Sequence, residues 1–201
     1  MADYRLKSDF ALLNLAGEVS ETSVMVWEVI GEANEKGIEW ERQHSAVYYR
    51  EEGMGRDYLS DGAEDDADVE GRLDWVAFKQ NFFSALLTAE GGFEPGAYLA
   101  SAPIEEDSTA TMRYVAELPV AFQSVGSTSG TTFRWFYGPN DLPILERTGL
   151  EEVGRIIDYG WWIFGWVNRH LILPLYNWLT SSIANVGIVI LIITVIIKLA
   201  L

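Results

Sequence analysis

The chain has the sequence VMVWEVI at residues 24–30, and this stretch sets the expectation for the fold. Its β-branched and aromatic residues are typical of a β-strand. Similar short stretches, separated by glycine and proline turn signals, follow at residues 45–49, 75–78, 112–122 and 131–137. Many short strands without long intervening helices favour antiparallel sheets. We therefore expect a mainly β class, with residues 1–148 forming an antiparallel β sandwich.

The charge of the chain is negative and unevenly distributed. The 201 residues include 30 Asp and Glu against 14 Lys and Arg, which gives a net charge of −16. Every acidic residue lies between Asp3 and Asp158, and only Arg169 and Lys198 are basic beyond that point. Because phosphate binding needs clustered cations, we expect no nucleic acid among the partners. The lack of cysteine excludes disulfides and thiolate metal sites.

The segment from Glu51 to Asp74 is the most acidic part of the chain. It holds ten acidic residues against Arg56 and Arg72. A charge run of this kind predicts a solvated, irregular loop. The run at residues 66–71 mimics the start of an EF-hand loop, but position twelve would be an alanine and a strand follows, so a calcium site is rejected.

No motif in the chain indicates an enzyme. The two histidines, His44 and His170, are too far apart in sequence for a zinc-protease motif. Neither a nucleophile elbow nor a glycine-rich phosphate loop is present. We therefore expect no catalytic residues, no metal ion and no cofactor.

The amino-acid composition changes after the last expected strand, and the sequence then favours helices. Asp141 is placed to cap a short amphipathic helix over residues 142–157, which Gly149 could interrupt. Residues 159–179 then combine dense aromatic residues with a few cations, and Pro174 predicts a kink. This composition is typical of a segment at a membrane interface, although a buried aromatic helix is an alternative. The residues expected to meet the membrane interface are Trp161, Trp162, Trp166, Arg169 and Trp178.

Residues 186–197 are uncharged, and Lys198 follows them. A membrane-spanning helix needs about 20 residues, whereas about 16 precede the end of the chain. We therefore expect residues 149–182 to be a linker with interfacial helices and residues 183–201 to be a truncated transmembrane helix. Lys198 would lie about 16 Å into that span. Its cation could face a water-filled cavity or a partner. Alternatively, the span ends at Lys198 and its ammonium group snorkels to the far membrane surface.

Four stretches of the chain resemble the YidC membrane protein insertases. The first is residues 158–179. The second is residues 185–198, a stretch that begins with an Asn-x-Gly motif. The other two, WVAFKQNFFS at residues 75–84 and FYGPN at residues 136–140, are similar to signatures of the family's periplasmic domain. The lysine at position 198, where many members have arginine, is similar to the Bacteroidetes branch.

The resemblance implies a periplasmic β sandwich, an amphipathic helix on the outer surface of the bacterial inner membrane, and a multi-pass core around a hydrophilic groove. Lys198 corresponds to the basic residue that projects into that groove, and Thr194 of the same helix is the second residue expected in the groove. Residues 1–182 would be periplasmic. The implied partners are nascent membrane proteins, the Sec translocon with its accessory subunits, and the lipid bilayer.

The resemblance also implies that the chain is a fragment of a longer insertase. It would lack the first anchoring helix, which explains why no export signal is seen, and the other four core helices. Two alternatives stay open: a membrane-tethered carbohydrate-binding module, suggested by the sandwich and its many aromatic residues, and a single-span adaptor that docks partners.

Overall fold

The computed structural model describes residues 4–13, 22–105, 109–125, 128–157 and 167–200. Contacts within the chain divide it into two compact units, residues 1–156 and residues 157–201. The first unit therefore ends at residue 156 rather than at the expected 148.

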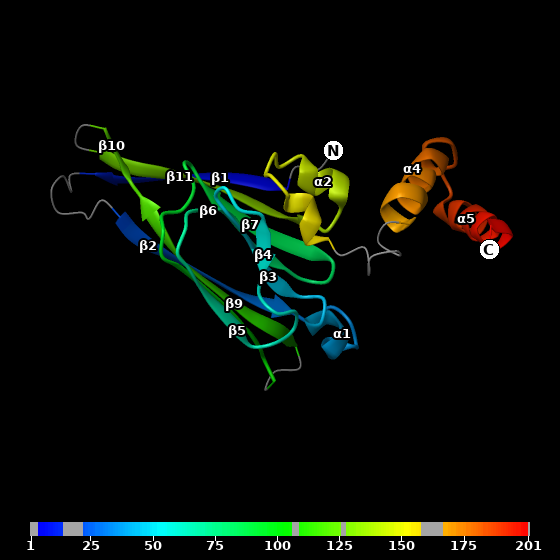
Figure 1. Cartoon of the computed structure of the whole chain (residues 1–201), viewed down its shortest axis with the longest axis horizontal. Helices are drawn as coiled ribbons and strands as arrows, with labels where there is room; N and C mark the ends of the chain where they lie inside the picture. The colour runs from blue at the N-terminus through cyan, green and yellow to red at the C-terminus, as the bar shows by residue number, and fades with distance from the viewer. Residues whose placement is uncertain (1–3, 14–21, 106–108, 126–127, 158–166, 201) are drawn as a thin grey trace. The chain divides into compact units, whose positions relative to one another are not determined.

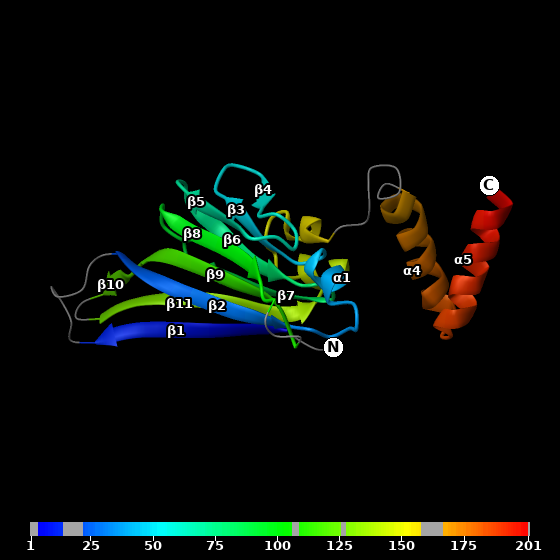
Figure 2. The same cartoon turned by 90° about the horizontal axis from the view of Figure 1, so that it is seen from below.

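The first unit consists of two antiparallel sheets (Figure 1; Figure 2). The larger sheet has the order β1 (Arg5–Leu13), β11 (Thr128–Pro139), β7 (Phe83–Ala89), β6 (Leu73–Lys79), β3 (Ala46–Glu51) and β4 (Arg56–Tyr58), with β10 (Gln123–Val125) also paired to β11. The smaller sheet has the order β2 (Thr22–Glu32), β9 (Ala110–Ala121), β8 (Ala97–Pro103) and β5 (Asp65–Val69). The expected mainly β class is confirmed.

The core lies between the two sheets. Trp27 of β2 stacks on Phe78 of β6 with ring centroids 4.0 Å apart, and Phe78 stacks on Tyr114 of β9 at 5.3 Å. In the stretch at residues 24–30, Met25, Trp27 and Val29 belong to this core, whereas the residues between them are exposed. This alternation follows from the strand geometry, in which successive side chains point to opposite faces.

The outer face of the larger sheet is partly covered by the last segment of the unit, α2 (Leu142–Glu146) and the 3₁₀ helix η1 (Val153–Ile156), drawn in yellow in Figure 1. Val76 and Phe78 face the core, so Trp75 points outward, yet it is fully buried. Its indole nitrogen donates to the carbonyl of Glu151 at 3.0 Å. Residues 149–156 consequently belong to the sandwich unit.

The helix expected over residues 142–157 is broken into two short pieces, so that prediction is wrong in its extent. Asp141 caps α2 as expected, because its carboxylate accepts from the backbone N–H of Ile144 at 3.1 Å. Gly149 and Glu152 then adopt φ of 75° and 60°. A left-handed backbone conformation cannot continue a right-handed helix, so the helix is interrupted at Gly149, as the sequence indicated.

The acidic segment from Glu51 to Asp74 is not an irregular excursion. It contains β4 and β5, and β6 begins within it. In β5, Ala67 and Val69 pack against the core while Asp66 and Asp68 are exposed. The acidic residues thus occupy the water-facing side of an ordinary edge strand.

A short helix, α1 (Ile38–Arg42), is hydrogen-bonded to one end of the sandwich. The buried Arg42 donates from Nε to the carbonyl of Thr111 at 3.1 Å and also binds the carbonyl of Ile104. The buried carboxylate of Glu41 accepts from the backbone N–H of Asn34 at 2.9 and 3.0 Å. Both buried charges are therefore compensated by hydrogen bonds.

The second unit is a helical hairpin of α4 (Leu173–Ser182) and α5 (Val186–Ala200), preceded by the π-helical turn η2 (Asn168–Ile172). Leu179 of α4 packs with Val189 and Ile193 of α5. Among the described helices, none combines the length and the apolar character needed to cross a membrane.

Candidate functional site

Thr194 and Lys198 lie together on one exposed face of α5. At about 100° per residue, they are separated by only about 40° around the helix, and Lys198 lies about 180° from Val189. Because Val189 and Ile193 pack against α4, the face of Thr194 and Lys198 is turned away from the other helix of the hairpin. We call it the Thr194–Lys198 face.

The rest of the Thr194–Lys198 face is apolar or small. Gly187 and Leu191 continue the same stripe toward the start of α5, and the Leu191 side chain is 65% exposed. The Thr194 hydroxyl donates to the carbonyl of Ile190 at 2.8 Å. The hydroxyl proton of Thr194 is therefore used within the helix, whereas the hydroxyl oxygen can still accept a hydrogen bond from outside. The face thus offers one acceptor and one cation on an otherwise apolar helix.

Asn185 explains the Asn-x-Gly motif in physical terms. Its side-chain oxygen accepts from the backbone N–H groups of Gly187 at 3.0 Å and Ile188 at 3.4 Å. This is the geometry of an N-cap, which satisfies donors that the first turn of a helix leaves unpaired. The motif therefore fixes where α5 begins and, with it, the register of Thr194 and Lys198.

The residues expected at the membrane interface are only partly described. Trp178 on α4 is 68% exposed, and Arg169 lies in η2. Trp161, Trp162 and Trp166 lie outside the described residues. The π-helical turn ends at Ile172, and Pro174 lies in the first turn of α4.

Two stretches that carry the family resemblance, residues 75–84 and residues 136–140, meet at one corner of the sandwich. The Asn140 amide donates to the carbonyls of Gln80 at 2.7 Å and Asn81 at 3.2 Å, and its oxygen accepts from the Ser84 hydroxyl at 2.5 Å. The backbone N–H of Asn140 donates to the carbonyl of Phe82 at 2.8 Å. We call this the Asn140 corner.

The Asn140 corner was not assigned a role from the sequence alone. The available signal was that an Asn after Gly-Pro ends one motif while the other contains a turn between two strands. The sequence does not reveal that the Asn140 side chain donates to backbone carbonyls of a turn about sixty residues earlier.

A cluster of charges holds the last segment against the larger sheet. Arg50 forms ion pairs with Asp74 and with Glu151, the latter at 2.7 Å. Glu152 accepts from the backbone N–H of Arg56 at 2.8 Å. That hydrogen bond, followed by the charges of Arg155 and Arg50, holds the pKa of Glu152 below its usual value. This cluster is structural, because each charge has a partner within the fold.

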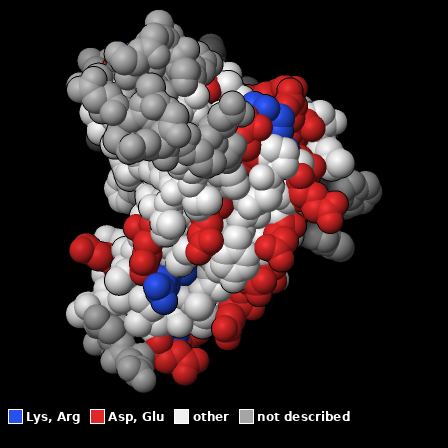
Figure 3. Space-filling model, turned by 90° about the vertical axis from the view of Figure 1, so that its left-hand side faces the viewer, with Lys and Arg blue, Asp and Glu red and all other residues white. Residues whose placement is uncertain are grey.

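Within the described ranges, no group of three or more His, Asp or Glu side chains is arranged to hold a metal ion. Acidic side chains dominate the charged surface at the end of the sandwich shown in Figure 3.

These features define a two-sheet β domain joined to an apolar helical hairpin. Residues 5–173 match the family model of the YidC periplasmic domain. Because this match covers more than half of the chain, the chain belongs to the YidC periplasmic-domain family, and the resemblance seen in the sequence is confirmed.

Curated relatives are named membrane protein insertase YidC. The protein of Phocaeicola vulgatus is 30% identical over 98% of this chain and 34% of its own length. That of Parabacteroides distasonis is 29% identical over 88% of this chain and 29% of its own length. That of Azobacteroides pseudotrichonymphae is 29% identical over 100% of this chain and 34% of its own length. The chain spans about a third of the length of these relatives.

Proposed function

We propose that this chain is the periplasmic and first core-helix part of a membrane protein insertase of the bacterial inner membrane. In this proposal residues 1–182 are periplasmic, and α5 belongs to a helix that crosses the membrane within a longer, multi-pass parent. The observation that carries the proposal is the Thr194–Lys198 face, which is turned away from α4 on an otherwise apolar helix.

The physical basis of insertion is the cost of polar groups in hydrocarbon. A cation near the middle of a bilayer costs about 2.5–3.5 kcal/mol on insertion scales, so such residues face water or a partner. A wet groove lined by Lys198 and Thr194 would receive a polar segment of a nascent membrane protein and lower the cost of its unpaired groups. The apolar helix of the client then moves into lipid. This process uses no nucleotide, cofactor or covalent step, and the protein is not an enzyme.

The segment at residues 159–179 would lie along the outer surface of the membrane. Trp161, Trp162, Trp166 and Trp178 would sit at headgroup depth, where tryptophan is enriched, and Arg169 would meet lipid phosphates. The exposure of Trp178 is compatible with this role. Besides the lipid bilayer, the proposed partners are nascent membrane proteins and the Sec translocon with its accessory subunits.

The carbohydrate-binding alternative is less well supported. It was motivated by the abundance of aromatic residues, but Trp27, Trp75 and Tyr114 are buried. Buried rings cannot stack on a sugar, so part of the motive for that alternative is removed, whereas Trp40, Tyr58 and Tyr137 are exposed.

Complementation of a strain depleted of its insertase tests the proposal. In the full-length parent, Lys198→Arg should support growth, because the charge is retained, whereas Lys198→Ala should impair insertion of polar clients at unchanged protein abundance. Val195→Ala, on another exposed part of α5, is the matched control and should behave as wild type. Full activity of Lys198→Ala toward all clients would overturn the assigned role.

A further inference from the structure

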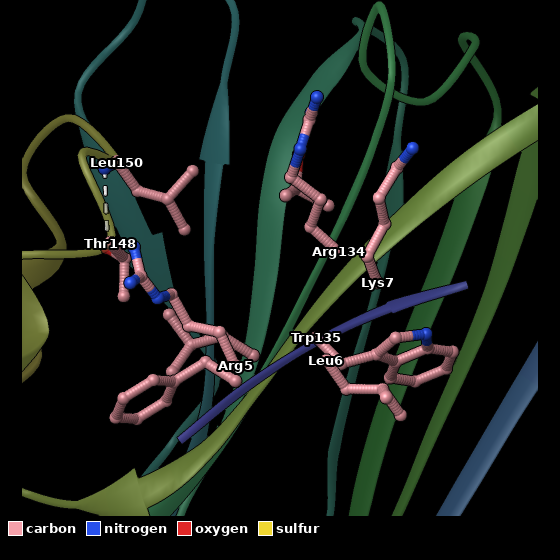
Figure 4. Close-up of a pocket in the computed structure, with 10 residues that line it drawn as sticks. Arg5, Leu6, Lys7, Arg134, Trp135, Thr148 and Leu150 are labelled. Atoms are coloured by element: carbon pink, nitrogen blue, oxygen red, sulfur yellow. Dashed lines mark hydrogen bonds between the residues drawn. The ribbon is translucent and has the colours of Figure 1, made fainter. Parts of the chain in front are cut away.

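The outer face of the larger sheet holds a cavity of about 490 Å³ (Figure 4). Three adjacent strands, β1, β11 and β7, form its base, and residues 148–150 form one wall. Half-buried Leu150 and the buried side chains of Leu86 and Phe136 form its apolar lining, while three basic side chains, Arg5, Lys7 and Arg134, supply charge. None of the residues that line the cavity is acidic, although the chain has more than twice as many acids as bases.

Two of these cations are forced together by strand pairing. Lys7 of β1 lies directly opposite Arg134 of β11 in the antiparallel register. Figure 4 shows that the two side chains extend in the same direction from the sheet. Like charges directly opposite each other destabilise a strand pair. The arrangement is therefore unfavourable by itself and becomes favourable when an anion lies between them.

The fold compensates one of these two charges, that of Lys7, and leaves Arg134 without a carboxylate partner among the described residues. Asp9 pairs with Lys7 at 3.0 Å. Its pKa is lowered first by hydrogen bonds from Thr132 and Lys7, with smaller contributions from the charges of Lys7 and Arg134. Within the described part of the chain, no hydrogen bond or ion pair holds the Arg134 guanidinium. Arg42, Arg50, Arg72, Arg113 and Arg155, in contrast, each form an ion pair with a carboxylate.

We propose that this cavity binds a short acidic peptide segment with apolar side chains, such as a translocated loop of a client membrane protein. The carboxylates would meet Lys7 and Arg134, and the apolar side chains would pack against Leu150. The choice of client rests on the proposed function: translocated loops carry few Lys and Arg, so few of their charges repel Lys7 and Arg134.

The net charge of the chain favours a short segment over an extended anionic surface. At physiological salt, charges beyond about 8 Å are largely screened, so a peptide inside the cavity experiences mainly the local cations. An anionic membrane would instead face the many carboxylates on the rest of the surface. We therefore assign a peptide rather than a lipid bilayer to this site.

Fluorescence anisotropy of a labelled peptide tests the proposal. The probe is a capped decapeptide of Glu, Asp, Leu and Gly, titrated with the full 201-residue chain in zwitterionic detergent at physiological salt, where the rest of the chain's charge is screened. A peptide with Lys in place of each acid is the charge control. The double variant Lys7→Gln/Arg134→Gln should weaken binding about tenfold, since each exposed ion pair contributes modestly. Arg113→Gln, an exposed arginine on the other sheet, is the matched control and should change nothing.

Three outcomes would overturn the proposal. The first is no saturable binding of the acidic peptide, and the second is equal binding by the double variant. The third is stronger, Lys7- and Arg134-dependent binding to phosphatidylglycerol vesicles than to the peptide, which would assign the site to lipid. If the peptide binds as expected but Lys198→Ala complements fully, the cavity is still a peptide-binding site, whereas the role proposed for Lys198 is wrong.

Discussion

The sandwich and the helical hairpin bury their apolar side chains to very different degrees. In the sandwich, Trp75, Phe78 and Tyr114 are completely buried. In α5, Leu191 and Leu199 are 65% and 83% exposed, although the helix is apolar along almost its entire length. The first unit therefore completes its own core in water, whereas the second presents an apolar surface that needs lipid or other protein to cover it.

The polar groups of the two units differ in the same way. In the sandwich, Arg42 and Asn140 each satisfy backbone groups of distant segments. In the hairpin, the described side-chain hydrogen bonds are local, such as those of Asn185 and Thr194. Long-range polar contacts thus specify the sandwich, while the hairpin relies on helix formation and a small contact between two helices.

The largest effect is expected from Trp27→Ala, which removes the ring that joins the two sheets. Loss of a buried Trp costs about 3–5 kcal/mol, because transfer energy is lost and a cavity remains. Urea denaturation of the chain in detergent, followed by tryptophan fluorescence, should show this loss while far-ultraviolet circular dichroism retains the helical signal of the hairpin. Val26→Ala, one residue away and exposed, should change stability by less than about 0.5 kcal/mol. Equal losses in the two variants would contradict the assigned core.

A smaller effect is expected from Asn140→Ala. The substitution leaves the carbonyls of Gln80 and Asn81 and the hydroxyl of Ser84 without their partner. Unpaired polar groups of this kind cost about 1–3 kcal/mol. The same urea titration measures the loss, and Gln43→Ala at an exposed position is the control. If the two variants are equally stable, the Asn140 corner does not stabilise the sandwich.

The smallest effect is expected from Glu152→Gln, and it should depend on pH. The pKa of Glu152 is held below its ordinary value of 4.5, mainly by the backbone N–H of Arg56. Folding thus favours the ionised carboxylate, so its contribution is complete above about pH 4.5 and is lost as the pH falls through the lower, folded-state pKa. Thermal melts should show the wild type losing stability more steeply than Glu152→Gln on acidification.

The control for the acid-dependent loss is Glu146→Gln, which changes an exposed carboxylate in the same segment of the chain. This variant should follow the wild-type pH profile. A parallel profile for Glu152→Gln and wild type would show that ionisation of Glu152 is not coupled to folding.

The sequence predicted the sandwich because its strands carry a strong pattern of β-branched and aromatic residues. It failed for β5, where charge density concealed the alternation that places Ala67 and Val69 inward. It also failed for the helix after Asp141, because the ion pair and hydrogen bonds of residues 151–152 with Arg50, Arg56 and Trp75 select a different backbone.

The candidate sites were predictable only where they are local. Thr194 and Lys198 are four residues apart, so helical periodicity alone places them on one face. Lys7 and Arg134 come together through pairing of strands 127 residues apart, and Asn140 reaches a turn sixty residues upstream. Such contacts depend on register, which the sequence of one strand does not reveal.

The most direct test of the difference between the two regions is the labelling of single cysteines by a water-soluble maleimide, with the full-length parent in intact membranes. The chain has no native cysteine, so each introduced thiol of this segment reports on one position. We predict that Thr194→Cys and Lys198→Cys react readily, that Ile188→Cys and Val195→Cys react poorly because lipid covers them, and that a cysteine at Val26 reacts fully. Uniform labelling along α5, or protection of positions 194 and 198, would contradict the account.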